Sequence, residues 1–365
     1  MSKPFRGRIA IVGTGSRAAI FVRGIVERPE SSRVVALCEP NTVRVAYYND
    51  LLKSLALEVG GTCVWPAYRF RVLTEKPIAT DVDRCRRILD AVNRTNSHIT
   101  MSFNYRYNPI HELIKRTIAE GKIGKVLSVH FKWPLDTVHR ADYFRRWHRQ
   151  ENSGGLTVHK SGHHFDLVSY WIDAEPVTVA AMRGLTFYGD KAGKEKGWTR
   201  DYERARGSEA AKSDPFAINL EADHTLKKIY ADAESVDGYN RDQNVFAPGI
   251  GIEDDTAYSP WEGYRVNFNG SQGRLELEST MDGLIHETES LPHAGGVRVT
   301  LQNPWQKPTQ LPVKVDHGSH GGGDTRMLSV LFGPLPAQAV DQGDAAKQGP
   351  TERRRAGAGG WVVGE

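Results

Sequence analysis

The residues best suited to chemistry lie close together in the stretch N-S-G-G-L-T-V-H-K-S-G-H-H-F-D-L at positions 152–167. If this stretch begins an amphipathic helix that continues to Trp171, four polar side chains at i, i+4, i+7 and i+11 share one face. They are His159, His163, Asp166 and Tyr170. Imidazoles one turn apart above a carboxylate can relay protons, hold a sugar hydroxyl or bind a metal. The pattern also fits a helix whose histidines are buried and hydrogen-bonded.

A zinc site is the least favoured of these alternatives. The spacing of His159 and His163 would allow two of the ligands. However, residue 160 is Lys rather than the Glu of the H-E-x-x-H motif, and the sequence offers no obvious third ligand. We therefore expect no metal.

A glycine-rich turn near the N-terminus is the second candidate site. The apolar run at Arg8–Val12 is typical of a buried parallel strand, and a helix is expected at Ala19–Val26. Between them lies Gly13-Thr14-Gly15-Ser16-Arg17-Ala18. In such a turn the first glycine permits the bend, the second lets the backbone approach a pyrophosphate, and the small alanine lets helix and strand pack closely.

A carboxylate follows the next expected strand, Arg33–Leu37, at the position where dinucleotide-binding proteins hold the adenosine ribose. Glu39 lies close to the ~20-residue spacing expected for that role. A solvated strand end is the less favoured alternative. A carboxylate here repels a 2′-phosphate and so favours NAD over NADP, although the nearby Arg44 leaves NADP possible.

The elements between the two motifs alternate between helix and strand. We expect a helix at Asn41–Leu57 with Asn41 as N-cap, and a strand at Arg71–Thr74 that leads into Glu75-Lys76-Pro77. A helix capped by Asp81 follows at Asp81–Val92, and a strand at Ser97–Phe103 precedes N-Y-R-Y-N-P at 104–109.

Taken in order, the glycine turn, the E-K-P tripeptide, the N-Y-R-Y-N-P segment and the G-G-to-H-x-x-D stretch resemble the Gfo/Idh/MocA oxidoreductases over roughly residues 5–330. The resemblance implies an α/β Rossmann-type nucleotide-binding domain at 1–103. An α+β domain with a large, mostly antiparallel sheet would follow at 104–330 and bind substrate. In this family that sheet often forms a homo-oligomer interface. Residues 331–365 are expected to be a disordered tail.

The resemblance also assigns roles to particular residues. Lys76 of E-K-P and His163 are implied to handle the proton of the reacting hydroxyl, with Asp166 supporting the helix. His159 stands where the family carries an aspartate, so an acceptor is replaced by a group that can donate, accept or carry charge. We expect it to orient the hydroxyl or share the proton.

The cofactor, NAD or possibly NADP, is expected to contact Gly13, Thr14, Gly15, Ser16, Arg17, Glu39, Glu75, Lys76 and Pro77. The substrate, a sugar, polyol or sugar derivative, is expected to contact Asn104, Tyr105, Arg106, Trp147, Asp166 and His320. For Trp147, stacking on a sugar and packing in the core remain alternatives. A related branch of NAD-dependent glycosidases oxidises its sugar only transiently, so net oxidation is not the only reaction implied.

Composition limits the class of protein. The chain has 365 residues, enough for two domains, and its net charge of +4 comes from basic residues scattered among acidic ones. The sequence therefore does not predict a nucleic-acid-binding surface. Three cysteines without C-x-x-C spacing favour a reducing, cytoplasmic compartment. We find no signal peptide and no apolar run near the ~20 residues that a membrane helix needs.

Three places depart from a complete member of the family. Only residues 58–70 separate the predicted second helix from the E-K-P strand, whereas one βαβ crossover needs roughly 30 residues or more. A second gap is expected between Asp255 and Thr256, and residues 348–365 stand where a final helix would be. We therefore expect a cofactor domain that lacks a strand and a helix. A truncated, inactive dinucleotide-binding protein is the alternative.

Three later segments have simple local patterns. Pro176–Met182 is a strand candidate, and Lys191–Asp214 reads as a charged, solvated insertion. Tyr264–Leu277 predicts a hairpin that turns at Asn269-Gly270.

Overall fold

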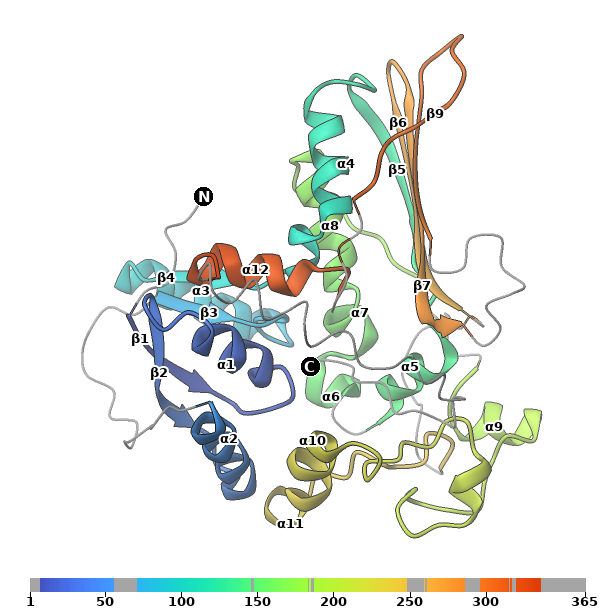
Figure 1. Cartoon of the computed structure of the whole chain (residues 1–365). Coiled ribbons are helices and arrows are strands. Elements are labelled where there is room, and N and C mark those ends of the chain that lie inside the picture. Colours follow the sequence, from blue (N-terminus) through green and yellow to red (C-terminus); the bar gives the residue numbers. More distant parts are fainter. Residues whose placement is uncertain are drawn as a thin grey trace, which may run out of the picture.

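A computed structural model of the chain describes residues 7–55, 71–145, 148–182, 184, 187–247, 259, 261–285, 296–314, 316 and 320–335. Figure 1 shows an N-terminal group of helices and strands beside a tall sheet with two helices along it. Four features predicted from the sequence lie outside the described residues. They are Trp147, the short connection at 58–70, the junction of Asp255 and Thr256, and the tail beyond residue 335.

The N-terminal elements alternate between strand and helix as predicted. They are β1 (Gly7–Val12), α1 (Ala18–Val26), β2 (Ser32–Cys38), α2 (Thr42–Ser54), β3 (Arg71–Thr74), α3 (Val82–Thr95) and β4 (His98–Met101). Both predicted caps are confirmed, because Asn41 accepts from the amides of residues 43 and 44, and Asp81 accepts from that of residue 84.

The four parallel strands do not join into one sheet within the described residues. β1 pairs with β2, and β3 pairs with β4, as two separate two-stranded sheets. Parallel strands are normally covered on both faces. Here Val12 of β1 is 65% exposed and Val82 of α3 is 62% exposed, and α3 has no buried residue. This arrangement agrees with the short sequence between Glu39 and Glu75.

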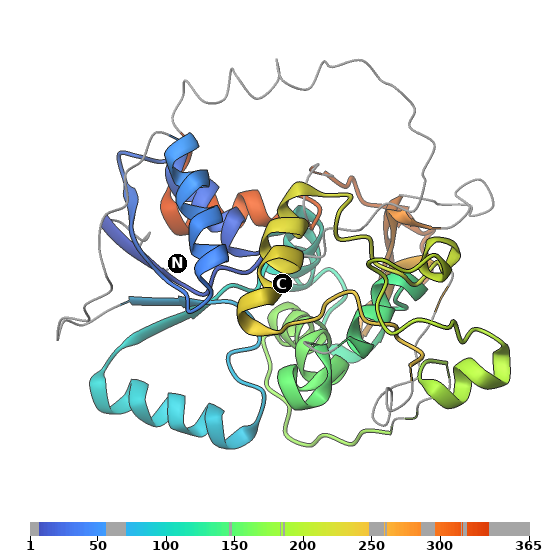
Figure 2. The ribbon, with the colours of Figure 1, turned by 90° about the horizontal axis from the view of Figure 1, so that it is seen from below.

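Segments from much later in the chain complete the core of this N-terminal group. One is α12 (Gly323–Phe332), and the other is a helical segment made of α10 (His224–Leu226), a π-helical turn (Lys227–Asp232) and α11 (Glu234–Asp237). Their buried side chains pack with those of α1 and α2 in one cluster that includes Val22, Tyr48, Ile229 and Met327. Figure 2 shows the helical segment at 224–237 beside α2. The domain boundary at residues 103 and 104 stays a prediction.

The C-terminal group is built on a five-stranded antiparallel sheet in the order β5-β6-β7-β8-β9. The strands are β5 (Val126–Lys132), β6 (Trp261–Gly270), β7 (Arg274–Ile285), β8 (Val297–Gln302) and β9 (Thr309–Gln310). The helices are the 3-10 turn η1 (Asn104–Tyr107), α4 (Pro109–Ala119), α5 (Thr137–Ala141), the 3-10 turn η2 (Asp142–Phe144), α6 (Gln150–Ser153), α7 (Gly155–His159), α8 (Gly162–Ile172), α9 (Asp190–Lys196) and the 3-10 turn η4 (Ala210–Ser213). These two groups confirm the predicted fold class.

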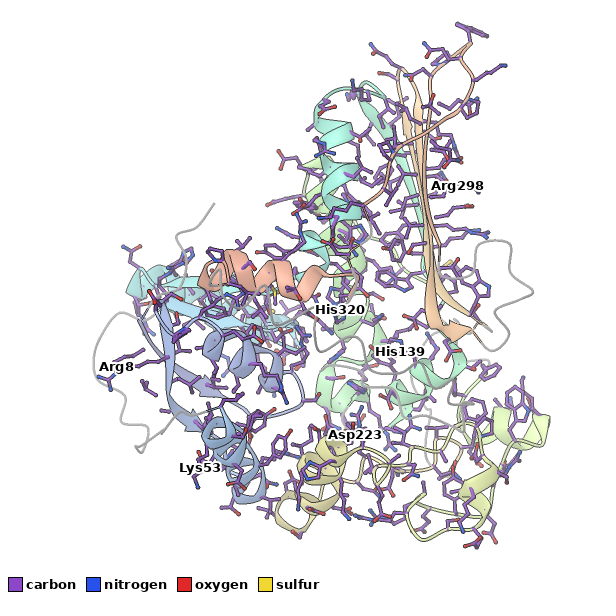
Figure 3. All side chains as sticks on the ribbon, in the orientation of Figure 1. Arg8, Lys53, His139, Asp223, Arg298 and His320 are labelled. Atoms are coloured by element: carbon purple, nitrogen blue, oxygen red, sulfur yellow. The ribbon has the colours of Figure 1, made fainter. Side chains whose placement is uncertain are left out.

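One face of the sheet packs against α4 and α8, as Figure 1 shows. Alternation along β6 sends Tyr264, Val266 and Phe268 into this core beside Trp171 of α8. The opposite face is charged. Arg298 of β8 pairs with Glu278 of β7 and projects away from the helices (Figure 3).

Two local predictions were wrong. Residues 176–182 form no strand, and Val177 and Met182 are each 99% exposed. None of the described strands pairs with them. The insertion at 191–214 is not wholly solvated, because it contains most of α9, and Ala192 and Ala211 are buried. Among the described residues, no helix is long and apolar enough to cross a bilayer.

Candidate functional site

The central stretch is two helices rather than one. α7 ends at His159 and α8 begins at Gly162, so the prediction of one polar face shared by four residues was wrong. His163, Asp166 and Tyr170 lie on α8, while His159 lies at the end of α7. Glycine at the start of α8 has low helix propensity, and the intervening Lys160 is drawn into the core.

His163 is buried against aromatic rings near the N-Y-R-Y-N-P segment. Its ring centroid lies 4.7 Å from that of Tyr105 and 6.1 Å from that of Phe103. Burial lowers the pKa of His163 well below its usual range, and the cations of Lys76 and Lys160 lower it further. The Nδ1 atom has no hydrogen-bond partner within the described part of the chain. His163 is therefore a neutral imidazole at pH 7.

His159 lies in a second group of rings, apart from those around His163. Its ring centroid is 4.7 Å from that of His148 and 6.0 Å from that of Tyr143. Burial lowers its pKa to about 2, assisted by the cation of Lys76. It is likewise neutral at pH 7, so it can act as a hydrogen-bond partner but not as a cation.

Lys76 joins the E-K-P strand end to the histidine helices. The half-buried Lys76 Nζ donates to the backbone oxygen of His159 at 2.9 Å. The peptide bond between Lys76 and Pro77 is cis. The structure thus brings Lys76, His159 and His163 together as the sequence predicted, although the roles of these residues stay predictions.

Sequence reasoning missed a buried ionic group behind these histidines. Glu262 of β6 accepts from His139 Nδ1 at 2.6 Å, and its other oxygen lies 3.6 Å from Lys160 Nζ. The Lys160 ammonium also lies 4.9 Å from the centroid of the Trp133 ring. Despite burial, the neighbouring His139 and the Lys160 ammonium lower the pKa of Glu262 to about 2. The signal was present, because Glu262 has the same parity along β6 as the core residue Tyr264.

Asp324 at the start of α12 accepts four hydrogen bonds from three residues, of which Arg17 and Asn104 lie far away in the sequence. It accepts from Arg17 through both of its oxygens, from Asn104 Nδ2 at 2.9 Å, and from His320 Nδ1 at 2.8 Å. Arg17 also donates to Glu75 at 3.1 Å, which ties the glycine turn to the E-K-P segment. These bonds join four predicted site residues, Arg17, Glu75, Asn104 and His320, in one network. Their polar atoms bond to one another, whereas the sequence assigned them to cofactor or substrate.

Arg106 and Asp166 form a second link. The Arg106 guanidinium donates to both oxygens of Asp166, with Nε at 3.0 and 2.9 Å. The guanidinium also lies over the ring of Tyr170, 5.3 Å from its centroid. This pair fixes η1 to α8, which supports the predicted structural role for Asp166. Trp147, the remaining substrate candidate, lies outside the described residues.

The glycine turn has the features that a dinucleotide requires. A Cβ placed on Gly13 or Gly15 would meet no atom within 4 Å, so there is open space beside the turn. No side chain caps the N-terminus of α1, whose first amides, those of Ala18 and Ala19, donate to the oxygens of Gly15 and Ser16 at 3.2 and 3.3 Å. Tyr48 donates to the oxygen of Gly15 at 2.5 Å, and Ser16 accepts from Tyr230 at 3.4 Å. The residues present therefore fit a bound pyrophosphate.

Glu39 is already engaged with the turn that it was predicted to serve. One oxygen accepts from the amide and the hydroxyl of Thr14, at 2.9 and 3.0 Å, and the other accepts from the amide of Asn41 at 2.9 Å. A carboxylate has about four lone-pair positions, so one remains for a ribose hydroxyl. In the described ranges, no three histidine, cysteine, aspartate or glutamate side chains are grouped to hold a metal ion.

Comparisons with known proteins agree with this geometry. Residues 115–227 match the model described as "Oxidoreductase family, C-terminal alpha/beta domain", the Gfo/Idh/MocA C-terminal model. The chain is 31% identical over 121 residues to an inositol 2-dehydrogenase of Rhizobium meliloti, covering 33% of this chain and 34% of that one. An oxidoreductase from Agrobacterium radiobacter, solved with NAD+, L-tartaric acid and magnesium, superposes with a TM-score of 0.52 at 10% identity, over 94% of this chain and 89% of that one.

A longer alignment decides the family. YteT of Bacillus subtilis, a protein named as an oxidoreductase, is 35% identical to the chain over 300 residues. The match covers 74% of this chain and 68% of YteT. By this alignment, the C-terminal model and the shared fold, the chain belongs to the Gfo/Idh/MocA family of oxidoreductases.

Proposed function

We propose that this chain transfers a hydride between NAD and a carbinol carbon of a sugar, polyol or sugar derivative. The observation that carries the proposal is the contact between Lys76 and the histidine helices, where Nζ lies 2.9 Å from the oxygen of His159. This contact sets a lysine and two neutral imidazoles beside the end of the E-K-P strand. The inositol 2-dehydrogenase relative supports a polyol or sugar as the substrate class.

The proton is the part of the reaction that the chain's own residues handle. Oxidation of an alcohol releases the hydroxyl proton as the hydride leaves carbon, so a nearby base is needed. His163 is neutral at pH 7 because of burial, and it can accept that proton. Lys76 and His159 would orient the hydroxyl by hydrogen bonds, and the nearby cation of Lys76 would favour a developing alkoxide.

The residues of the glycine turn would hold the dinucleotide. The backbone of the glycine turn, where Gly13 and Gly15 leave open space, would bind its pyrophosphate, and Glu39 would accept from a ribose hydroxyl. When bound, the nicotinamide ring accepts or donates the hydride. The Arg17–Glu75 bond of 3.1 Å holds the turn and the E-K-P segment at a fixed separation.

Binding and turnover test this proposal separately. Titration calorimetry and thermal shift would measure NAD+ and NADH binding to the purified chain, and ligand at about 100 Kd should add about 2.7 kcal/mol of stability. A panel of polyols, aldoses and uronates would then be followed by the absorbance of NADH. We expect binding and at least one substrate. A folded protein that binds no nicotinamide dinucleotide would overturn the proposal.

A non-catalytic dinucleotide-binding role is the second candidate, and one observation favours it. The two parallel sheets are not joined within the described residues. The glycine turn after β1 and the E-K-P segment after β3 are therefore not held together by strand pairing, as they would be in a continuous sheet. NAD+ binding without turnover of any substrate would select this role. Release of an aglycone from a glycoside without net NADH would instead select a glycosidase.

A further inference from the structure

Arg44 on α2 is the residue whose position decides which dinucleotide the proposed site can take. In dinucleotide-binding folds, an arginine near the acidic ribose residue can accommodate the 2′-phosphate of NADP. Arg44 occupies such a place, because its Nη1 lies 3.9 Å from Glu39 Oε1. Whether it can bind a phosphate depends on what else holds its guanidinium.

Both remaining nitrogens of that guanidinium are held by the helical segment at 224–237. Nη2 lies 2.8 Å from Asp237 Oδ2, and Nε donates to the backbone oxygen of Ile229 at 2.9 Å. The Arg44 side chain is largely buried, with 15% of its surface exposed. The guanidinium is therefore enclosed by two carboxylates and a carbonyl, all acceptors that a phosphate would have to displace.

Asp237 is itself fixed in this position. Asn41 Nδ2 donates to Asp237 Oδ2 and to the oxygen of Ala233, both at 2.9 Å. The amide of Asn41 also donates to Glu39. Asp237 thus belongs to the same hydrogen-bonded group as the ribose carboxylate, although it lies almost 200 positions later in the chain.

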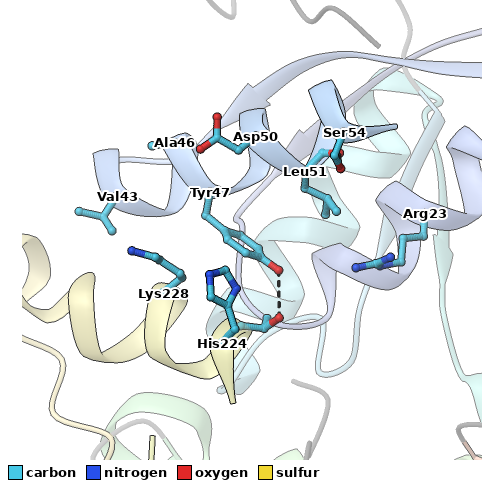
Figure 4. A pocket seen from close by; sticks show the side chains of 10 residues that line it. Arg23, Val43, Ala46, Tyr47, Asp50, Leu51, Ser54, His224 and Lys228 are labelled. Carbon is cyan, nitrogen blue, oxygen red and sulfur yellow. Dashed lines mark hydrogen bonds between the residues drawn. The ribbon is translucent and has the colours of Figure 1, made fainter. Parts of the chain in front are cut away.

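The segment that carries Asp237 is tied to α2 a second time, nearer to α10. The hydroxyls of Tyr47 and Thr225 share a hydrogen bond of 3.0 Å, drawn in Figure 4. This bond lies beside an open cavity of about 490 Å³ between α1, α2 and α10. Glu39, Arg44 and Asp237 do not line that cavity, so a ligand there would leave their contacts unchanged.

We propose that Asp237 is a specificity-determining residue that holds Arg44 away from the 2′ position and so excludes NADP in favour of NAD. The inference rests on the proposed dinucleotide-binding function. A 2′-phosphate would be repelled by the two carboxylates of Glu39 and Asp237 and attracted by one guanidinium. It would form a hydrogen bond with Arg44 only if the Arg44–Asp237 pair broke. A ribose with a free 2′-hydroxyl needs only an acceptor, which Glu39 provides.

The test compares Kd values of NAD+ and NADP+ by titration calorimetry for the full-length wild type and for two variants, Asp237→Asn and Asp237→Ala. The wild type should prefer NAD+. Each variant removes the carboxylate that pairs with Arg44 Nη2, so the Kd of NADP+ should fall by about tenfold, as expected for one charge-assisted hydrogen bond gained. The Kd of NAD+ should change by no more than about twofold.

Asp232→Asn is the matched control. Asp232 lies on the same segment and pairs with Lys228 at 2.7 Å, but it does not contact Arg44. It should leave the ratio of the two Kd values unchanged. Adding Arg44→Met to Asp237→Asn should abolish the gain in NADP+ binding, because the gain is carried by the released guanidinium.

The outcomes separate this inference from the function on which it rests. A wild type that binds NADP+ as tightly as NAD+ would overturn the role of Asp237 and leave the oxidoreductase proposal intact. So would folded Asp237 variants with an unchanged ratio. Binding of neither dinucleotide by the folded wild type would remove the proposed function itself, and the inference with it.

Discussion

Arg17 and Asp324, 307 positions apart in the sequence, form a two-pronged buried ion pair with nitrogen–oxygen distances of 3.1 and 3.0 Å. Arg17 lies in the glycine turn, and Asp324 lies in the first turn of α12. The pair therefore fixes the proposed cofactor turn to the last helix of the described chain. Asn104 and His320 bond to the same carboxylate, so the N-Y-R-Y-N-P segment is held by the same link.

Replacing Asp324 by Asn should destabilise the protein strongly. Neutralising one partner of a buried pair leaves the other charge poorly compensated, which costs about 3–5 kcal/mol. Burial opposes ionisation of Asp324, but the hydrogen bonds from His320 and Arg17 lower its pKa overall, as expected for a charged carboxylate. Urea denaturation would measure the loss. Asp83→Asn, which breaks an exposed pair with Arg86, should change stability by less than about 0.5 kcal/mol.

Stability should fall as the pH is lowered from 7 to 5. Burial lowers the pKa of His111 to about 3, of His159 to about 2 and of His164 to about 4, and that of His163 well below its usual range. Below pH 6.5 the unfolded chain binds protons at these positions and the folded chain does not. Each histidine therefore lowers the free energy of unfolding by about 2 kcal/mol between pH 7 and pH 5.

Denaturation at pH 7, 6 and 5 would measure that slope. His164→Asn removes one of the four groups and should make the slope shallower, while substitution of the exposed His130 should leave it unchanged. Equal stability of the wild type at pH 5 and pH 7 would show that these histidines are not buried in neutral form.

Lys76→Met and His163→Asn should each lower kcat by about 10²–10⁴, because each removes a group proposed to act on the hydroxyl proton. For His163→Asn the Kd of NAD+ should change by less than about threefold, since Glu39, Lys76 and the glycine turn are untouched. Steady-state kinetics would measure kcat, and calorimetry would measure the Kd of NAD+. His130→Asn serves as the control, and an unaltered kcat in His163→Asn would remove that residue from the mechanism.

Lys160→Met should move the acid limb of the kcat/KM profile to higher pH. The Lys160 cation is one of the causes that lower the pKa of His163, so its removal allows that imidazole to gain a proton more easily. Because Glu262 would then lose one cation, Lys160→Met with Glu262→Gln gives a second variant in which both charges are absent. If neither variant moves the acid limb, His163 is not the group that titrates.

Local patterns in the sequence predicted the elements well. The strand–turn–helix at residues 7–26 and the caps at Asn41 and Asp81 depend on neighbouring residues alone, and all are present. The hairpin is also confirmed, although β6 runs to Gly270 and the turn lies at 271–273. The register of such a turn is set by cross-strand pairing, which a single strand's sequence does not contain.

The tertiary contacts were not predictable in the same way. Helical spacing placed His159 and His163 on one face, but α7 ends at His159, and Lys160, which lies between the two histidines, is buried beside Glu262. The sequence also left the role of Arg44 open, because its partner Asp237 lies on a segment that only the folded chain brings near. Where charged groups from distant segments pair, local patterns carry no signal of the partner.

The dependence of the N-terminal core on α12 has a consequence for synthesis. The first hundred residues leave the ribosome before α12 exists, and at 5–20 residues per second they wait roughly 10–50 s for residue 332 to emerge. During that interval the apolar side of α1 that meets Leu328 remains uncovered. Apolar surface that is exposed during synthesis favours aggregation, so the yield in a cell should depend on how fast the last third of the chain is translated.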